Sequence, residues 1–91
     1  MRYPKQLGAL GRTKRGKIIL TNPKGESFNV HETVAFIWDK ANGFRTIKEI
    51  SDSLIEALQV SEEFQEGERE NVILALRSLE RKSLLEYRQA K

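Results

Sequence analysis

The sequence predicts an α+β fold in which an N-terminal three-stranded antiparallel sheet is followed by three helices. Over residues 6–30, short apolar or β-branched runs alternate with turns that contain Gly or Pro, as is typical of strands. From residue 32 onward, apolar side chains recur every three or four residues, as in helices that bury one face. Ninety-one residues correspond to a single domain, 1–91, whose ordered part we expect over about 6–87.

The three strands are predicted over residues 6–12, 17–21 and 26–30. The first is a weak candidate, because Gly8 and Gly11 dilute its apolar residues. The second is a better candidate, because it contains two adjacent isoleucines, and β-branched side chains suit a pleated backbone. The third shows the alternation of apolar and polar residues that a half-buried strand requires.

The connections place the third strand at an edge of this sheet. The tetrapeptide Asn22–Gly25 is a strong β-turn signal, with asparagine first, proline second and glycine fourth. Short connections imply an antiparallel meander in chain order, which leaves residues 26–30 outermost. Phe28 and Val30 then face the core, and the outer backbone groups of this strand are open to another strand.

Three amphipathic helices follow the sheet. The second has the clearest start, because Thr46 and Glu49 have the spacing of a capping box. His31 precedes the first helix, where we expect it to bond a backbone amide, and Gly43 stops that helix. The helices are predicted over residues 32–42, 47–58 and 68–82, with an acidic loop over 59–67.

Both ends of the chain are expected to be poorly ordered. Pro4 opposes regular structure, so residues 1–5 are predicted to be loose. Leu84 and Leu85 are predicted to form a short extended tail after the last helix. Residues 88–91 are then expected to fray, as the last residues of a domain commonly do.

Charge is distributed unevenly along the chain. The first 25 residues carry seven basic and no acidic side chains, whereas the remainder carries nine basic and thirteen acidic ones. A basic segment can attract an acidic partner or nucleic acid, but lysine and arginine also protect sheet edges from aggregation. No aromatic residue interleaves with the charges from Arg12 to Lys24, which argues against a nucleic-acid platform. The seven basic residues are Arg2, Lys5, Arg12, Lys14, Arg15, Lys17 and Lys24.

Residue types that carry catalysis or bind metals are scarce. His31 is the only histidine and the chain has no cysteine, so neither a zinc cluster nor a nucleophile–base pair is supported. No glycine-rich phosphate loop precedes a helix. We therefore expect a non-catalytic protein without cofactor or metal. No apolar run could span a membrane and no secretory signal opens the chain, so we expect a cytoplasmic protein.

Two surfaces remain for binding: the open edge of strand 26–30 and the outer face of the third helix. If they lie side by side, an extended peptide can add as a further strand and place alternate side chains against the helix. The charges of that helix can equally be ordinary solvated charge, and a second copy could pair with the same edge as a homodimer. The predicted peptide-binding residues are Glu26, Ser27, Phe28, Asn29, Val30, Ile73, Leu74, Arg77, Glu80 and Arg81.

An ordered set of short segments resembles the PqqD family over about residues 16–86. No single segment is diagnostic, but together they cover nearly the whole chain in the family's order. Ser83 stands where the family usually has a glycine before its two leucines. The segments are Pro23–Gly25, Phe28–Trp38, Gly43–Ile50, Leu76–Leu79, Lys82 and Leu84–Leu85.

This resemblance implies a small winged-helix-like domain that recognises the leader of a ribosomally made precursor peptide. In such domains the leader adds as a strand between the third strand and the third helix. The domain then acts as a peptide chaperone, which presents the precursor to a modifying enzyme, often a radical SAM protein. The implied site coincides with the two surfaces identified above.

The alternative from another class is a winged-helix DNA-binding protein or transcriptional regulator, in which the third helix would contact DNA. Arg77, Arg81 and Lys82 would then lie near phosphates or bases. Acidic residues on and after that helix oppose phosphate binding, so we expect no nucleic-acid partner. A third possibility is a subunit of a larger assembly whose groove another chain fills. The opposing acidic residues are Glu68, Glu70, Glu80 and Glu86.

Overall fold

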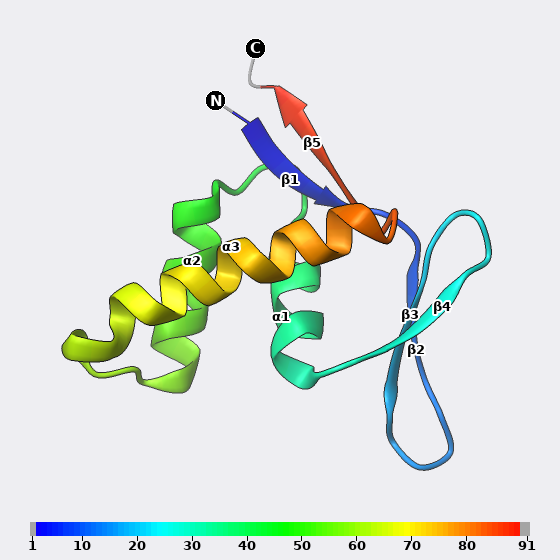
Figure 1. Cartoon of the computed structure of the whole chain (residues 1–91), viewed down its shortest axis with the longest axis horizontal. Coiled ribbons are helices and arrows are strands. Elements are labelled where there is room, and N and C mark those ends of the chain that lie inside the picture. Colours follow the sequence, from blue (N-terminus) through cyan, green and yellow to red (C-terminus); the bar gives the residue numbers. More distant parts are fainter. Residues whose placement is uncertain (1, 90–91) are drawn as a thin grey trace.

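The computed structural model describes residues 2–89, which form five strands, three α-helices and one 3-10 turn (Figure 1). The predicted α+β class is confirmed, with an antiparallel meander followed by three helices. Two further strands, one from each end of the chain, were not predicted. In chain order the elements are β1 (Arg2–Gln6), β2 (Ala9–Arg12), β3 (Ile18–Thr21), β4 (Ser27–Val30), α1 (Glu32–Lys40), α2 (Ile47–Leu58), η1 (Glu62–Phe64), α3 (Gln65–Arg81) and β5 (Leu85–Gln89).

The meander sheet consists of β2, β3 and β4 in that order, as the short connections predict. Central strand β3 places Leu20 opposite Leu10 of β2 and opposite Phe28 of β4. Ile18 and Leu20 are buried, whereas every residue of β2 is exposed. The sheet therefore packs one face of β3 and β4 on the helices, while β2 extends into solvent as half of a projecting hairpin (Figure 1).

The terminal sheet pairs the two ends of the chain, β1 with β5, antiparallel. The prediction that residues 1–5 are loose is wrong for residues 2–5, and the prediction that residues 88–91 fray is wrong for residues 88 and 89. Met1 and residues 90–91 lie outside the described residues. Pro4 is compatible with β1 because its carbonyl accepts the Gly43 amide at 2.9 Å, so its backbone nitrogen also faces the α1–α2 connection and no hydrogen bond to β5 is lost.

Gly8 divides the stretch that was predicted as one weak strand, 6–12, into β1 and β2. Its φ of +87° lies in the left-handed region, which disfavours side chains. A Cβ atom there would lie 1.9 Å from the carbonyl oxygen of Thr21. Glycine is therefore required where the chain leaves the terminal sheet and enters the meander.

The helices begin close to their predicted positions. Thr46 and Glu49 form the predicted capping box, and bonds from the Thr46 amide and hydroxyl hold the pKa of Glu49 below its usual value. Helix α1 ends at Lys40 rather than Asn42. Helix α3 begins at Gln65, three residues before the predicted start. Glutamates in its first turn favour that start through the helix dipole.

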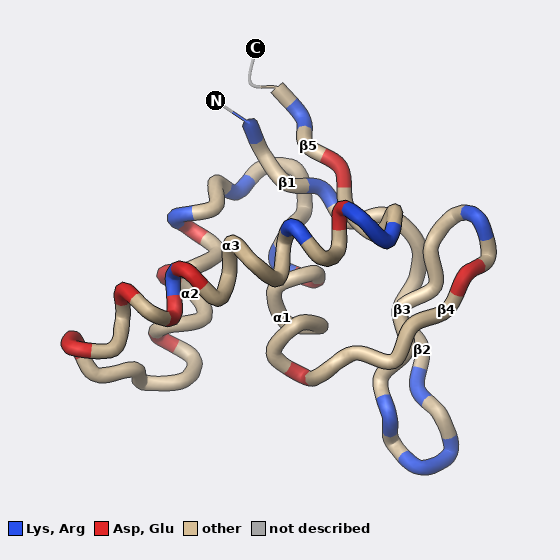
Figure 2. The backbone as a smooth tube through the Cα atoms, in the orientation of Figure 1, with Lys and Arg blue, Asp and Glu red and all other residues tan. Residues whose placement is uncertain are grey.

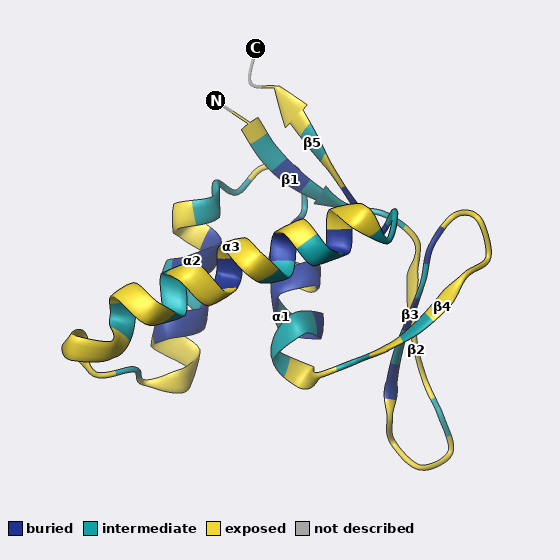
Figure 3. Ribbon diagram, in the orientation of Figure 1, coloured by how far each residue is buried: buried dark blue, intermediate teal, exposed yellow. Residues whose placement is uncertain are grey.

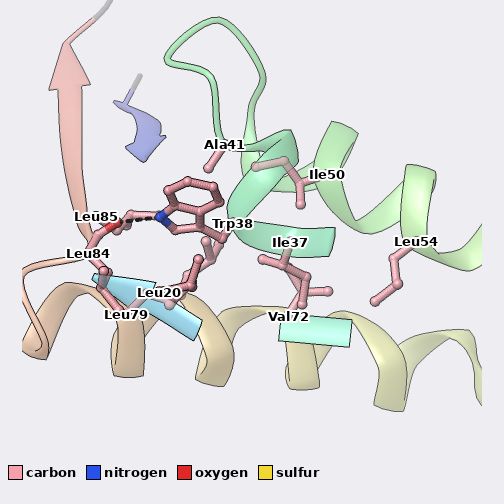
Figure 4. Packing of buried hydrophobic residues seen from close by; sticks show 11 residues of the cluster. Leu20, Ile37, Trp38, Ala41, Ile50, Leu54, Val72, Leu79, Leu84 and Leu85 are labelled. Carbon is pink, nitrogen blue, oxygen red and sulfur yellow. Dashed lines mark hydrogen bonds between the residues drawn. The ribbon is translucent and has the colours of Figure 1, made fainter. Parts of the chain in front are cut away.

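The core lies where the helices, β3 and the start of β5 meet (Figures 3 and 4). Trp38 is at its centre, and its indole Nε1–H donates to the carbonyls of Leu84 at 3.0 Å and Leu7 at 3.3 Å. These carbonyls belong to the connections that lead into the terminal sheet. No helix among residues 2–89 has both the length and the apolar character required to cross a bilayer. The central core residues are Leu20, Ile37, Trp38, Ala41, Ile50, Leu54, Val72, Leu76, Leu79, Leu84 and Leu85.

Candidate peptide-binding edge

Strand β4 is paired along one side only. Within the described chain its one strand partner is β3. The Asn22 amide donates to the Glu26 carbonyl at 2.9 Å, and antiparallel ladders alternate between hydrogen-bonded and non-bonded pairs. Ser27 and Asn29 therefore occupy non-bonded pairs, so their amides and carbonyls point away from β3. The outer edge of β4 thus offers two donors and two acceptors in the spacing that another strand can bond.

The side chains of β4 hold the strand in place and leave this edge accessible. Phe28 and Val30 are half-buried and pack against the core. Ser27 and Asn29 are exposed on the other face, where the Ser27 hydroxyl lies 2.9 Å from the hydroxyl of Thr21. The alternation predicted from the sequence is therefore confirmed for all four residues.

Asn22 fixes the turn between β3 and β4 against the end of α3. Its Oδ1 accepts the amides of Lys24 and Glu26, each at 3.0 Å. Its Nδ2 donates to the Lys82 carbonyl at 2.7 Å and to the Glu26 carboxylate at 3.0 Å. The side chain of Asn22 is almost completely buried. Predicted site residue Glu26 is consequently part of the turn that positions β4.

Lys82, directly after α3, lies beside β4. Its ammonium Nζ lies 5.5 Å from the centroid of the Phe28 ring, within the range of a cation–π contact. The same Nζ lies 3.3 Å from the hydroxyl of Ser78, one helical turn earlier. Leu74 precedes Ser78 by a further four residues and is 58% exposed. The side of α3 toward β4 therefore includes Ser78 and Lys82, with Leu74 at its border.

The opposite side of α3 faces α2 and β5. Arg69 marks it, because its guanidinium bonds the Asp52 carboxylate of α2 at 2.7 Å. Ile73, Arg77 and Glu80 follow Arg69 at helical spacing and so continue the same side. Ile73 is 39% exposed, and the two charged residues are exposed.

The pKa of Tyr87, in β5, provides independent evidence of which residues of α3 lie near β5. Burial of the phenol raises the pKa of Tyr87, Glu80 raises it further, and Arg2 and Arg77 oppose the shift. Arg77 and Glu80 are thus close enough to β5 to act on a group there. The structure does not bring these two, or Ile73, next to β4; Arg81 points between the two sides. Whether each contributes to binding stays a prediction.

Catalytic and metal-binding groups are not gathered at this edge. No cluster of three histidine, cysteine or acidic residues occurs within residues 2–89. The Nδ1 of His31 accepts the amide of Thr33 at 3.2 Å, which confirms its predicted role at the start of α1.

Two residues that position the site were not predicted for it: Asn22 and Lys82. The sequence identified Asn22 only as the first residue of a turn. Its contact with Lys82 joins positions 60 residues apart, and no local pattern signals such a pair. The amphipathic pattern of α3 defines its buried side, but it cannot tell which exposed side lies toward β4.

Comparison with known families identifies the family of this chain. The model of the family described as Coenzyme PQQ synthesis protein D (PqqD) matches residues 16–85. The matched segment runs from the β2–β3 hairpin tip through α3 to the first residue of β5. No curated protein and no solved structure matched the chain. The match extends over most of the sequence, and the chain therefore belongs to the PqqD family.

Proposed function

We propose that this protein binds an extended segment of a ribosomally made precursor peptide along the outer edge of β4. It then presents that precursor to a modifying enzyme, which we infer to be a radical SAM protein. The observation that carries this proposal is that the backbone amides and carbonyls of Ser27 and Asn29 point away from β3, in a strand that lies beside the end of α3. Membership of the PqqD family supports an accessory role in biosynthesis. In this role the protein supplies no catalytic group.

The bound peptide would add as a fourth strand of the meander. Its backbone would bond Ser27 and Asn29, and alternate side chains would contact the side of α3 that carries Leu74, Ser78 and Lys82. Phe28 and Val30 would lie beneath the peptide, because both are only half-buried. A net contribution of about 0.5–1.5 kcal/mol for each hydrogen bond would give useful affinity only together with side-chain contacts.

Backbone pairing can be tested with proline on the two outer edges of the meander. Asn29→Pro removes an outward amide of β4, and Leu10→Pro removes one of β2, by the same alternation of pairs. The probe is a display library of random twelve-residue peptides, from which binders of the wild-type protein are selected. We expect Asn29→Pro to abolish binding and Leu10→Pro to leave it within about threefold.

Because proline can also distort a strand, an ester bond in place of the Asn29 amide provides the stricter version. It removes the donor without fixing φ, and we expect affinity to fall about 2–10-fold. Protection of the Ser27 and Asn29 amides from hydrogen exchange should accompany binding. Undiminished affinity in the ester variant, with no protection, would reject strand addition at β4.

The contribution of α3 can be tested at two adjacent positions, Ile73 and Leu74. Leu74→Asp alters the border toward β4, whereas Ile73→Asp alters the side toward α2 and β5. Both side chains are exposed, so either change should leave the fold intact. We expect Leu74→Asp to weaken the selected peptides about tenfold, and Ile73→Asp to have at most a twofold effect. The reverse order would place the peptide on the other side of the helix.

Pairing of two copies through β4 would compete with the peptide for the same backbone groups. A homodimer of this kind should dissociate when a selected peptide is added, which size-exclusion chromatography would detect. A dimer that persists with peptide bound must use another surface.

A further inference from the structure

Basic residues are concentrated at the tip of the β2–β3 hairpin (Figure 2). Arg12, Lys14, Arg15 and Lys17 are all exposed there. The ion pairs found within residues 2–89 join Lys48 or Arg69 to Asp52, and Arg88 to Glu86; none includes a hairpin cation. Acidic residues are concentrated at the opposite end of the molecule, in η1 and the first turns of α3 (Figure 2). No carboxylate among the described residues therefore pairs with the charge of the hairpin.

This basic tip lies directly beyond the end of β4. A surface cavity of about 340 Å³ is shared between the two, lined by Gly16–Ile18 from the hairpin and by Asn29–Glu32 from the end of β4 and the start of α1. Lys17 and Asn29 thus line the same cavity. A strand advances about 3.3 Å per residue, so a peptide bonded to Asn29 reaches this cavity within one or two further residues.

The other end of β4 is also basic. Lys82 lies over Phe28, and Lys24 is exposed in the turn. Two carboxylates lie along the same path, those of Glu26 and Glu32. Glu26 already accepts a hydrogen bond from Asn22, and Glu32 lies at the first turn of α1, where the helix dipole favours it.

We propose that the strand which adds to β4 carries acidic side chains where it passes the β2–β3 hairpin. This inference rests on the proposed function and specifies the chemistry of its ligand. The ligand is an acidic peptide segment, whose Asp or Glu residues pair with Lys17, Arg15 and Lys14. Each exposed pair contributes little, so the effect is a several-fold preference together with faster association at low salt.

Nucleic acid is the other polyanion that could meet the same cations. The hairpin offers no aromatic side chain on which bases could stack. Helix α3 exposes Glu70 and Glu80, which repel phosphates. Lys17 also lines the same cavity as Asn29 of β4, whose open backbone edge a peptide can bond and a nucleic acid cannot. The observations therefore favour the peptide.

The test repeats the peptide-library selection on a charge variant of the full chain, Lys14→Gln/Arg15→Gln/Lys17→Gln. The matched control, Lys40→Gln/Lys48→Gln/Arg88→Gln, removes the same charge from α1, α2 and β5. Peptides selected on the wild type and on the control should be enriched in Asp and Glu over the unselected library. Those selected on the hairpin variant should show no enrichment.

A synthetic peptide from the wild-type selection then gives the size of the effect. We expect the hairpin variant to bind it about 5–30-fold more weakly than the control, with the difference shrinking at 0.5 M salt (about 4 Å Debye length). Melting temperatures of the two variants report whether both are folded, and the altered side chains are exposed or half-exposed.

The outcomes separate the two proposals. If selected peptides depend on the Asn29 amide but show no acidic enrichment, the acidic ligand is wrong and strand addition stands. If no selected peptide depends on that amide, strand addition fails and the acidic ligand fails with it. If the hairpin variant loses only the binding of a 20-base-pair DNA duplex, the cations serve nucleic acid and the present inference is overturned.

Discussion

The terminal sheet and the meander sheet differ in how fully their backbone groups are used. Strand β1 is bonded on both sides, to β5 along one and to the α1–α2 connection along the other, where the Gln6 amide donates to Ala41 and the Gly43 amide to Pro4. Among residues 2–89, the one strand partner of β4 is β3. One sheet thus uses its hydrogen bonds to hold the chain ends, and the other leaves the outward backbone groups of Ser27 and Asn29 without a strand partner among the described residues.

The family match follows the same division. It covers residues 16–85, which include β3, β4 and all three helices. It omits β1 and β2 and reaches only the first residue of β5. The proposed site at β4 therefore lies within the matched segment, whereas the terminal sheet lies almost entirely outside it. Changes at the junctions between the two sheets should alter stability, and changes at β4 should alter binding.

The largest effect is expected at the junction between the two sheets, from Gly8→Ala. The added methyl would collide with the Thr21 carbonyl at a backbone conformation that alanine disfavours. We expect a loss of about 2–5 kcal/mol in the free energy of unfolding, measured with urea. Gly11→Ala is the control, because open space surrounds that position. Equal stability of the two variants would contradict this expectation and show that the backbone at the junction can shift to accept the methyl group.

A smaller effect is expected where the meander meets α3, from Asn22→Asp. Aspartate can still accept the amides of Lys24 and Glu26, but it places an oxygen against the Lys82 carbonyl and the Glu26 carboxylate. We expect a loss of about 1–3 kcal/mol and faster amide exchange in β4. Glu26→Ala keeps the bond to Lys82, so it should cost less than about 1 kcal/mol. If Glu26→Ala is less stable than Asn22→Asp, the hydrogen bond from Asn22 to the Lys82 carbonyl contributes less to stability than the Glu26 side chain does.

The smallest effect is expected at the junction between α3 and β5, from Ser83→Gly. Ser83 has φ +58°, the left-handed conformation in which glycine is relaxed. We expect a gain of about 0.5–1 kcal/mol, since relief of strain is partly offset by the greater freedom of glycine in the unfolded chain. Ser83→Ala keeps the strain and should bring no gain. Peptide binding should be the same for all three proteins.

Local signals predicted most of the shared segment correctly. The Asn22–Gly25 turn, the alternation after it and the Thr46 capping box each depend on neighbours within five residues. Such features can be read from one stretch of sequence. The open edge of β4 then follows from strand order alone, because short connections force a meander.

Non-local pairing explains the failures. In β1, Tyr3 and Pro4 show no alternating pattern, and Arg2 finds its partner, Gln89, at the other end of the chain. The early start of α3 was missed because Gly67 signals a break, although a glycine inside a long helix costs only about 1 kcal/mol. The side of α3 that faces β4 depends on how the helix rotates about its axis in the packed fold. The predicted site residues Ile73, Leu74, Arg77 and Glu80 therefore come from more than one exposed side of α3, and whether each binds peptide stays a prediction.

Trp38 is an intrinsic fluorophore whose emission should respond to unfolding but not to peptide binding at β4. It is the only tryptophan in the chain, it is 5% exposed, and its Nε1–H bonds the carbonyls of Leu7 and Leu84. Its emission spectrum should shift to the red when the ends of the chain detach or the core opens. A peptide on the outer edge of β4 would not touch the indole. Fluorescence can therefore follow unfolding of the unlabelled protein at any degree of ligand saturation.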